Sequence, residues 1–182
     1  KKMNPNIKTT TLKEKTKIRI KQIMSSALKN LSSYNQDEVP SGEKEIFGIV
    51  VSEWNSQITD SLLEGAVSTL LKYEVDEKDI DIIHVPGSFE LPFGAAKLLE
   101  KNRRFSAIIC LGCVIQGETR HFDFICDAVA NGIMQLQLKE EIPVIFGVLT
   151  TNDLQQAIDR SGGKHGNKGV EAAITALKMA AL

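Results

Sequence analysis

Apolar residues follow two patterns that alternate along the chain. Four short segments are almost continuously apolar, as expected of strands buried on both faces of a parallel sheet. They cover residues 46–51, 80–85, 105–111 and 143–149. After each of them, apolar residues recur at the spacing of one helix face, and the last two helices are expected at 153–160 and from 170 onwards. This alternation predicts an α/β fold, a three-layer α/β/α sandwich built on a four-stranded parallel sheet.

The turns that follow the four strands carry the unusual residues of the sequence. They are Trp54-Asn55, the segment 86–90, the segment 117–121 and the segment 150–153. In open parallel sheets, ligands bind outside the carboxyl ends of the strands. We therefore expect one binding site at this edge of the sheet.

The segment 110–123 is the strongest candidate for the centre of that site. We expect its strand to end at Leu111, to be followed by a glycine-bounded turn, and to lead into a helix capped by Thr119. The free backbone N–H groups of such a turn, at the positive end of a helix dipole, can hold a phosphate. His121 falls in the first helical turn, beside that anion. Taken alone, the same pattern is also typical of a strand–helix turn that binds nothing.

The composition indicates one ordinary globular domain. The chain has 182 residues, of which 42% are hydrophobic and 25% charged. No apolar run approaches the roughly 20 residues that a membrane helix needs. Three cysteines argue against a disulfide framework and favour a reduced, cytoplasmic protein. Cys110 and Cys113 have C-x-x-C spacing, but without a second pair of ligands we expect neither a metal nor a redox site there.

Charge is distributed unevenly between the two parts of the chain. Residues 1–30 hold nine basic residues and one acidic residue, a net charge of +8, so the rest carries −9 of the total of −1. We expect residues 1–45 to be a basic N-terminal extension and linker, largely disordered, and residues 46–182 to be the folded domain. A targeting sequence and a polyanion-binding tail are alternatives for the extension. Nucleic acid is not an expected partner of the acidic domain.

Several side chains near the expected site have both a structural and a functional interpretation. Trp54 and Phe89 could pack at the rim of the fold or could stack on a flat heterocycle. Glu90 and Glu171 lie in first helical turns, where the dipole stabilises a carboxylate in any case. Basic residues surround a glycine-rich segment that could be a solvated turn or could supply the cation for an anionic substrate; they are Arg160, Lys164, His165 and Lys168.

Five separated blocks of this sequence resemble the 6,7-dimethyl-8-ribityllumazine synthase family. Their order and spacing together carry the resemblance, which covers about residues 46–182. The blocks are 54–55, 85–90, 112–123, 146–150 and 160–171. The resemblance implies a flavodoxin-like lumazine synthase domain and a transferase of riboflavin biosynthesis. It would condense 5-amino-6-(D-ribitylamino)uracil with 3,4-dihydroxy-2-butanone 4-phosphate, releasing phosphate and water, without metal or organic cofactor.

The resemblance also implies roles for individual residues. His121 matches the proton-transfer residue, and Arg160 matches the arginine that completes the phosphate site. The remaining matches are Trp54, Asn55, Ser88, Phe89 and Glu90 around the ring and ribityl chain, Gly117, Glu118 and Thr119 in the phosphate loop, and Phe146, Lys168 and Glu171 in the same cavity. Phe146 would come from a neighbouring subunit, because the sites of the family lie between protomers.

The resemblance further implies a homo-oligomer, a pentamer or a capsid of twelve pentamers. The turn 162–167 is compact, which favours the sixty-subunit capsid. Two residues depart from the family pattern: Trp54 stands where phenylalanine is more usual, and His84 stands where arginine is expected. A non-catalytic flavin- or phosphate-binding module on the same fold is the alternative function.

Overall fold

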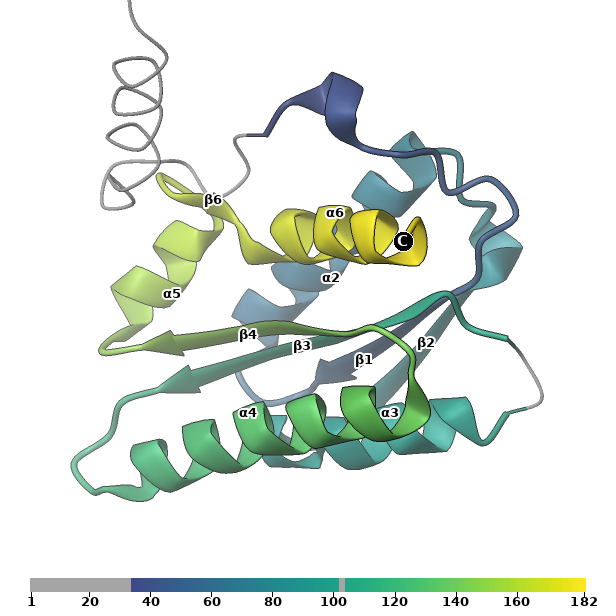
Figure 1. Ribbon diagram of the computed structural model, residues 1–182. Helices are drawn as coiled ribbons and strands as arrows, with labels where there is room; N and C mark the ends of the chain where they lie inside the picture. Colours follow the sequence, from purple (N-terminus) through teal and green to yellow (C-terminus); the bar gives the residue numbers. More distant parts are fainter. Residues whose placement is uncertain (1–33, 102–103) are drawn as a thin grey trace, which may run out of the picture.

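The four expected strands form one parallel sheet in the order β2-β1-β3-β4 (Figure 1). The computed structural model describes residues 34–101 and 104–182, so the basic residues 1–23 and the start of the expected linker lie outside the described residues. The strands are β1 (Phe47–Ser52), β2 (Ile80–Val85), β3 (Ala107–Ile115) and β4 (Val144–Thr151). The predicted fold class is confirmed.

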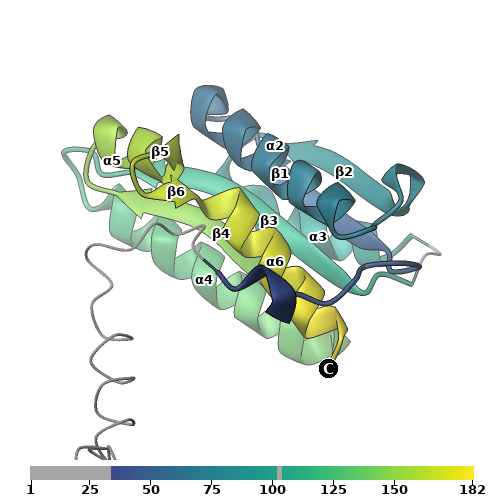
Figure 2. The same cartoon turned by 90° about the horizontal axis from the view of Figure 1, so that it is seen from above.

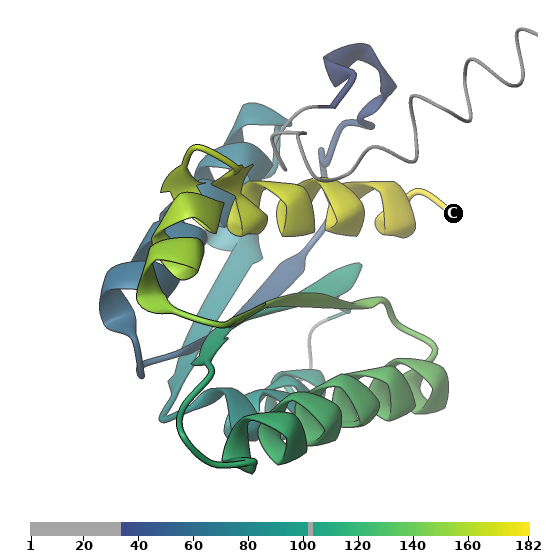
Figure 3. The same ribbon diagram turned by 90° about the vertical axis from the view of Figure 1, so that its left-hand side faces the viewer.

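Helices cover both faces of this sheet and make three layers (Figure 3). Two of them, α2 (Ser56–Lys72) and α6 (Lys168–Ala180), lie on one face, and α3 (Leu91–Leu99) and α4 (His121–Glu140) lie on the other. The short α5 (Leu154–Arg160) follows β4 at the carboxyl end of the sheet. Three-residue 3₁₀ helices are η2 (Gln36–Glu38), η3 (Glu77–Asp79) and η4 (Ser88–Glu90). Among the described residues, no helix is long and apolar enough to cross a membrane.

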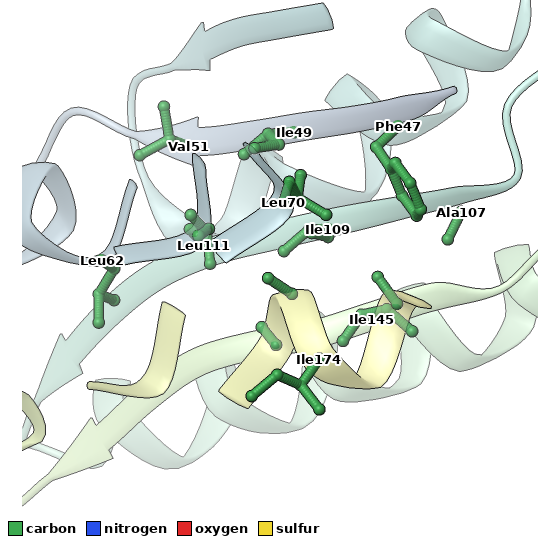
Figure 4. Packing of buried hydrophobic residues seen from close by; sticks show 14 of the residues in the cluster. Phe47, Ile49, Val51, Leu62, Leu70, Ala107, Ile109, Leu111, Ile145 and Ile174 are labelled. Atoms are coloured by element: carbon green, nitrogen blue, oxygen red, sulfur yellow. The ribbon is translucent and has the colours of Figure 1, made fainter. Parts of the chain in front are cut away.

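The sheet separates two hydrophobic cores, because successive strand residues point to opposite faces. In the first core, side chains of β1, β3 and β4 meet those of α2 and α6, as Figure 4 shows for Phe47, Ile109, Leu70 and Ile174. The second core joins the sheet to α3 and α4. Cys113 belongs to the first core and Cys110 to the second. The two thiols therefore lie on opposite faces of the sheet and do not form a common site.

Strand β3 extends further than the sequence pattern predicts. Its pairing with β1 ends at Val51 and Leu111, but its pairing with β4 continues to Ile115 and Thr151. The expected strand end at Leu111 is therefore wrong by four residues. A Cβ at Gly112 would lie 2.6 Å from the Oγ of Ser88, so this glycine serves a close approach within the strand and not a turn.

The segment 34–45, expected to be a linker, packs against the domain. It crosses the C-terminal part of α6 (Figure 2), and Val39 is buried in the first core. The N–H of Gly42 donates to the carbonyl of Tyr73 at 2.7 Å. A Cβ at Gly42 would overlap Val75 and Leu177. The packed structure thus starts upstream of the boundary predicted at Ile46.

The glycine-rich segment before α6, expected to be a turn, is a small antiparallel hairpin. It consists of β5 (Ser161–Gly163) and β6 (Gly166–Asn167). Gly162 and Gly166 have φ values of 125° and 83°, which favour glycine. Asn167 fixes the hairpin: its Oδ1 accepts the N–H groups of Gly169 and Val170, and its Nδ2 donates to the Ser61 carbonyl at 2.9 Å. Helix α6 therefore starts at Lys168, two residues earlier than predicted.

Candidate functional site

A cavity of about 190 Å³ lies beyond the carboxyl ends of β1 and β3, between the two strands where the chain changes direction across the sheet. This is the position at which open α/β sheets bind ligands. The lining residues, which define the Trp54 pocket, are Trp54, Asn55, Ser88, Phe89, Cys113, Val114, Ile115, His121 and Ile125. Five of the predicted site residues are thus together: Trp54, Asn55, Ser88, Phe89 and His121.

Two aromatic rings form exposed walls of the Trp54 pocket. Trp54 is 68% exposed and Phe89 is 56% exposed, although both are large and apolar. An apolar ring gains little by standing in water, so such exposure at a cavity favours ring stacking over rim packing.

Polar groups at the pocket have fixed orientations. Asn55 has a left-handed backbone (φ 61°) at the start of α2, and its Nδ2 donates to the Cys113 carbonyl at 3.0 Å. This bond anchors the amide to the extended end of β3 and leaves Oδ1 as an acceptor. Asparagine tolerates the left-handed conformation better than most residues.

Ser88 precedes helix α3 and does not cap it. It starts η4, which runs directly into α3; Gly87 is the N-cap of η4, and Glu90 is the N-cap of α3. The Oγ of Ser88 is buried and has no hydrogen-bond partner within the described part of the chain. A buried hydroxyl without a partner is costly, and this one packs against Gly112 of β3.

The expected phosphate loop joins β3 to α4 beside the Trp54 pocket. Thr119 is not the cap residue, because α4 starts at His121 and Arg120 takes the cap position. Instead the Thr119 Oγ1 accepts the His121 N–H at 3.3 Å, the two-residue pattern typical of threonine turns. A Cβ at Gly117 would meet nothing within 4 Å. The loop is therefore open on this side, and Glu118 is exposed.

A second cavity, of about 370 Å³, lies along the outer edge of β4 between α4 and α6. Its lining residues, which define the β4 groove, are Met134, Gln137, Val144, Ile145, Phe146, Lys168, Glu171, Ala172, Thr175 and Met179. Lys168 Nζ and Glu171 Oε1 are 2.5 Å apart. The other carboxylate oxygen of Glu171 is buried without a partner among the described residues. The two cavities share no residue, so the predicted site residues that line them form two separate groups. The predicted residues that line neither cavity are Glu90, Gly117, Glu118, Thr119 and Arg160.

Two of the predicted site residues, Glu90 and Arg160, make hydrogen bonds from their side chains to the backbone. The carboxylate of Glu90 accepts the N–H of Gly87 at 3.0 Å. Arg160 ends α5, and its Nη1 donates to the carbonyl of Gln156 at 3.1 Å. Neither residue lines the Trp54 pocket or the β4 groove. For Glu90, this bond supports the structural interpretation.

Sequence reasoning missed the apolar floor of the Trp54 pocket, formed by Cys113, Val114 and Ile115. The sequence did contain a sign that the strand continues, since the apolar run extends past Gly112 to Ile115. Burial raises the pKa of the Cys113 thiol to about 11, so this thiol stays protonated at neutral pH and serves as wall. No group of His, Cys, Asp and Glu residues able to hold a metal occurs within 34–101 and 104–182.

Residues 45–182 match the family model described as 6,7-dimethyl-8-ribityllumazine synthase. A protein of that name from Cytophaga hutchinsonii is 61% identical over 158 residues, which are 87% of this chain and 98% of the relative. Proteins of the same name from Phocaeicola vulgatus and Porphyromonas gingivalis are 53% and 52% identical, over 86% and 87% of this chain and 92% and 98% of their own lengths.

Proposed function

The chain belongs to the 6,7-dimethyl-8-ribityllumazine synthase family, and we propose that its Trp54 pocket holds the ring of the aminouracil substrate. The protein is a transferase that catalyses the penultimate step of riboflavin biosynthesis. Family membership favours this catalytic function over a non-catalytic flavin- or phosphate-binding module.

The proposed function rests on one observation: the same cavity is lined by two aromatic rings that can stack on a substrate and by His121, which can transfer protons. Trp54 and Phe89 offer ring faces, and the side-chain Oδ1 of Asn55 offers a polar contact. His121 stands at the N-terminus of a 20-residue helix, next to the loop 117–119. We assign the phosphate of the second substrate to this loop, because backbone N–H groups and the helix dipole stabilise an anion there.

The reaction needs proton transfers and a stabilised leaving group. The amine of the aminouracil attacks the ketone, and water leaves as the Schiff base forms; His121 moves protons in these steps. Loop N–H groups and Arg160 hold the phosphate as it departs. Ring closure is a second amine–carbonyl condensation, and holding two substrates side by side supplies much of the acceleration.

We further propose that a complete site combines the Trp54 pocket of one copy with the β4 groove of its neighbour. This would bring Phe146, Lys168 and Glu171 to the substrates bound beside His121. The surface of α4 supports assembly, since only Val129 and Ile133 of its residues are buried, while Phe124 and Leu138 are 68% and 72% exposed. Large exposed apolar side chains on one helix indicate a contact with another copy.

A subunit-mixing experiment tests both the activity and the shared site. The wild-type protein should form the lumazine product from the two substrates. Assemblies of only His121→Ala chains, or of only Lys168→Ala chains, should be impaired, because His121 lines the Trp54 pocket and Lys168 the β4 groove. If the two groups act across an interface, co-expression of the two variants should restore about a quarter of the wild-type sites, because random assembly leaves that share of interfaces intact. The separately purified variants, mixed without subunit exchange, are the control. A site confined to one chain would show no recovery.

The proposed assembly is a capsid of twelve pentamers in the cytoplasm. The compact β5–β6 hairpin, whose positive φ values allow a sharp bend, supports closure into a shell. The three cysteines are free thiols, which suits a reducing compartment. Sixty chains of 20.0 kDa amount to about 1,200 kDa. Light scattering at physiological salt should show that mass. A single species of five chains, at high protein concentration and with phosphate present, would contradict the capsid and leave the enzyme assignment unchanged.

A further inference from the structure

The indole ring of Trp54 lies against the backbone that follows β2. Two bonds bring these segments together: the Glu53 N–H donates to the Val85 carbonyl at 2.8 Å, and the Trp54 N–H donates to the Pro86 carbonyl at 3.0 Å. The turn after β1 therefore continues alongside the end of β2. Gly87 is the next residue of that segment, directly beside the indole.

Gly87 has no side chain, and the space that one would occupy is taken by the indole. A Cβ at this position would lie 3.0 Å from Cε3 and 3.3 Å from Cζ3 of Trp54, and 3.1 Å from the Oε2 of Glu90. The backbone of Gly87 is extended, with φ −140° and ψ 177°. Any residue can adopt this conformation, so it is the close approach of the ring that favours glycine here.

The Gly87 backbone is itself held in place from the other side. Its N–H donates to the Glu90 carboxylate at 3.0 Å, at the start of η4. The Glu90 carboxylate thus fixes the Gly87 backbone, and this backbone lies against the Trp54 indole. The ring is 68% exposed, so most of its surface is not held by packing.

We infer that Gly87 is a positioning residue, which sets where the Trp54 ring lies and so the space left for a flat heterocycle in the Trp54 pocket. The identity of that heterocycle, the aminouracil, rests on the proposed function. The contact between the Trp54 ring and Gly87 does not depend on the proposed function. Any larger residue at position 87 shifts the indole by a few tenths of an ångström, because exposed Trp54 gives way more easily than the bonded turn.

The test is Gly87→Ala in the full-length protein. We expect the KM for the aminouracil to rise about three- to tenfold, the range that one aromatic contact supports. The KM for the butanone phosphate and kcat should change less than twofold. Trp54 is the single tryptophan of the chain, so its fluorescence without substrate reports the ring directly. Its emission should change in Gly87→Ala and stay unchanged in Gly117→Ala, where an added Cβ meets nothing within 4 Å.

A double-mutant cycle separates positioning from a general effect on the fold. Phenylalanine lacks the second ring that includes Cε3 and Cζ3, so in a Trp54→Phe background the Gly87→Ala change should raise the aminouracil KM less than twofold. An equal rise in both backgrounds would overturn the inference, as would wild-type emission and KM in Gly87→Ala. A rise in both KM values with a lowered melting temperature would also overturn it in favour of a structural role. If the wild type were inactive, the proposed function would fail. The Trp54 emission of the substrate-free wild type and of Gly87→Ala would still show whether Gly87 sets the position of the ring.

Discussion

His121→Ala should lower kcat by about 10²- to 10⁴-fold, the contribution typical of a general acid–base group. The reason is positional, since His121 lines the Trp54 pocket and is the first residue of α4. An imidazole can serve as both proton donor and proton acceptor, as the Schiff-base steps require. Binding of both substrates should be nearly unchanged, because rings and loop N–H groups hold them.

Steady-state kinetics with each substrate varied in turn would measure this effect. His84→Ala is the matched control, because His84 is exposed at the end of β2 and lines neither cavity. Its kcat should stay within a factor of about two of the wild-type value. Wild-type kcat in His121→Ala would remove this residue from the mechanism. A loss of less than about tenfold would mean that water replaces the imidazole.

Arg160→Ala should raise the KM for the butanone phosphate by about 10- to 100-fold, since charge-assisted bonds are worth about 1.5–3 kcal/mol each. The KM for the aminouracil should change little. The guanidinium is planar and carries five donors. Its bond to the Gln156 carbonyl orients the group at the end of α5 while the rest of the fork can hold phosphate oxygens.

Competition by inorganic phosphate gives an independent measurement of the same contact. Phosphate should inhibit the wild type and inhibit Arg160→Ala much less. Arg160→Lys, which keeps the charge and loses the fork, should lie between them. Lys164→Ala is the control for net charge, since Lys164 pairs with Asp159 at 2.8 Å. Equal rises in both KM values for Arg160→Ala would indicate a folding role.

The sequence predicted the strands well where apolar runs end at clear turn residues. Strand β2 has the predicted limits, because Pro86-Gly87 ends its apolar run at once. For β3, Gly112 resembled the start of a turn, although its role is to admit Ser88. That role depends on a residue 24 positions away in the sequence and has no local signal.

The segment 34–45 and the β5–β6 hairpin were missed for a related reason. Both are polar and rich in turn residues, and local propensity gives such segments no regular structure. Their positions come from single tertiary contacts, such as buried Val39 and the bonds of Asn167. A few specific contacts between distant segments leave no periodic pattern for sequence reasoning to detect.

For the candidate site, local patterns predicted its place at the strand ends, and the resemblance supplied the individual roles. The structure brings His121, Trp54 and Ser88 to one cavity. It leaves Phe146 and Lys168 at another surface. The sequence of one chain has no pattern that distinguishes a contact within the chain from one across an interface. The resemblance indicated the division for Phe146 only, and not for Lys168.

The extension of β3 beyond β1 has a consequence for the entropy of substrate binding. The floor of the Trp54 pocket is paired strand, held by β4 up to Ile115 and Thr151. A floor made of loop would have to be ordered when substrate enters, at about 1–2 kcal/mol per residue fixed. Here that ordering takes place once, when the chain folds. The interactions of the ring with the pocket can then contribute to binding without an opposing loss of backbone freedom beneath it.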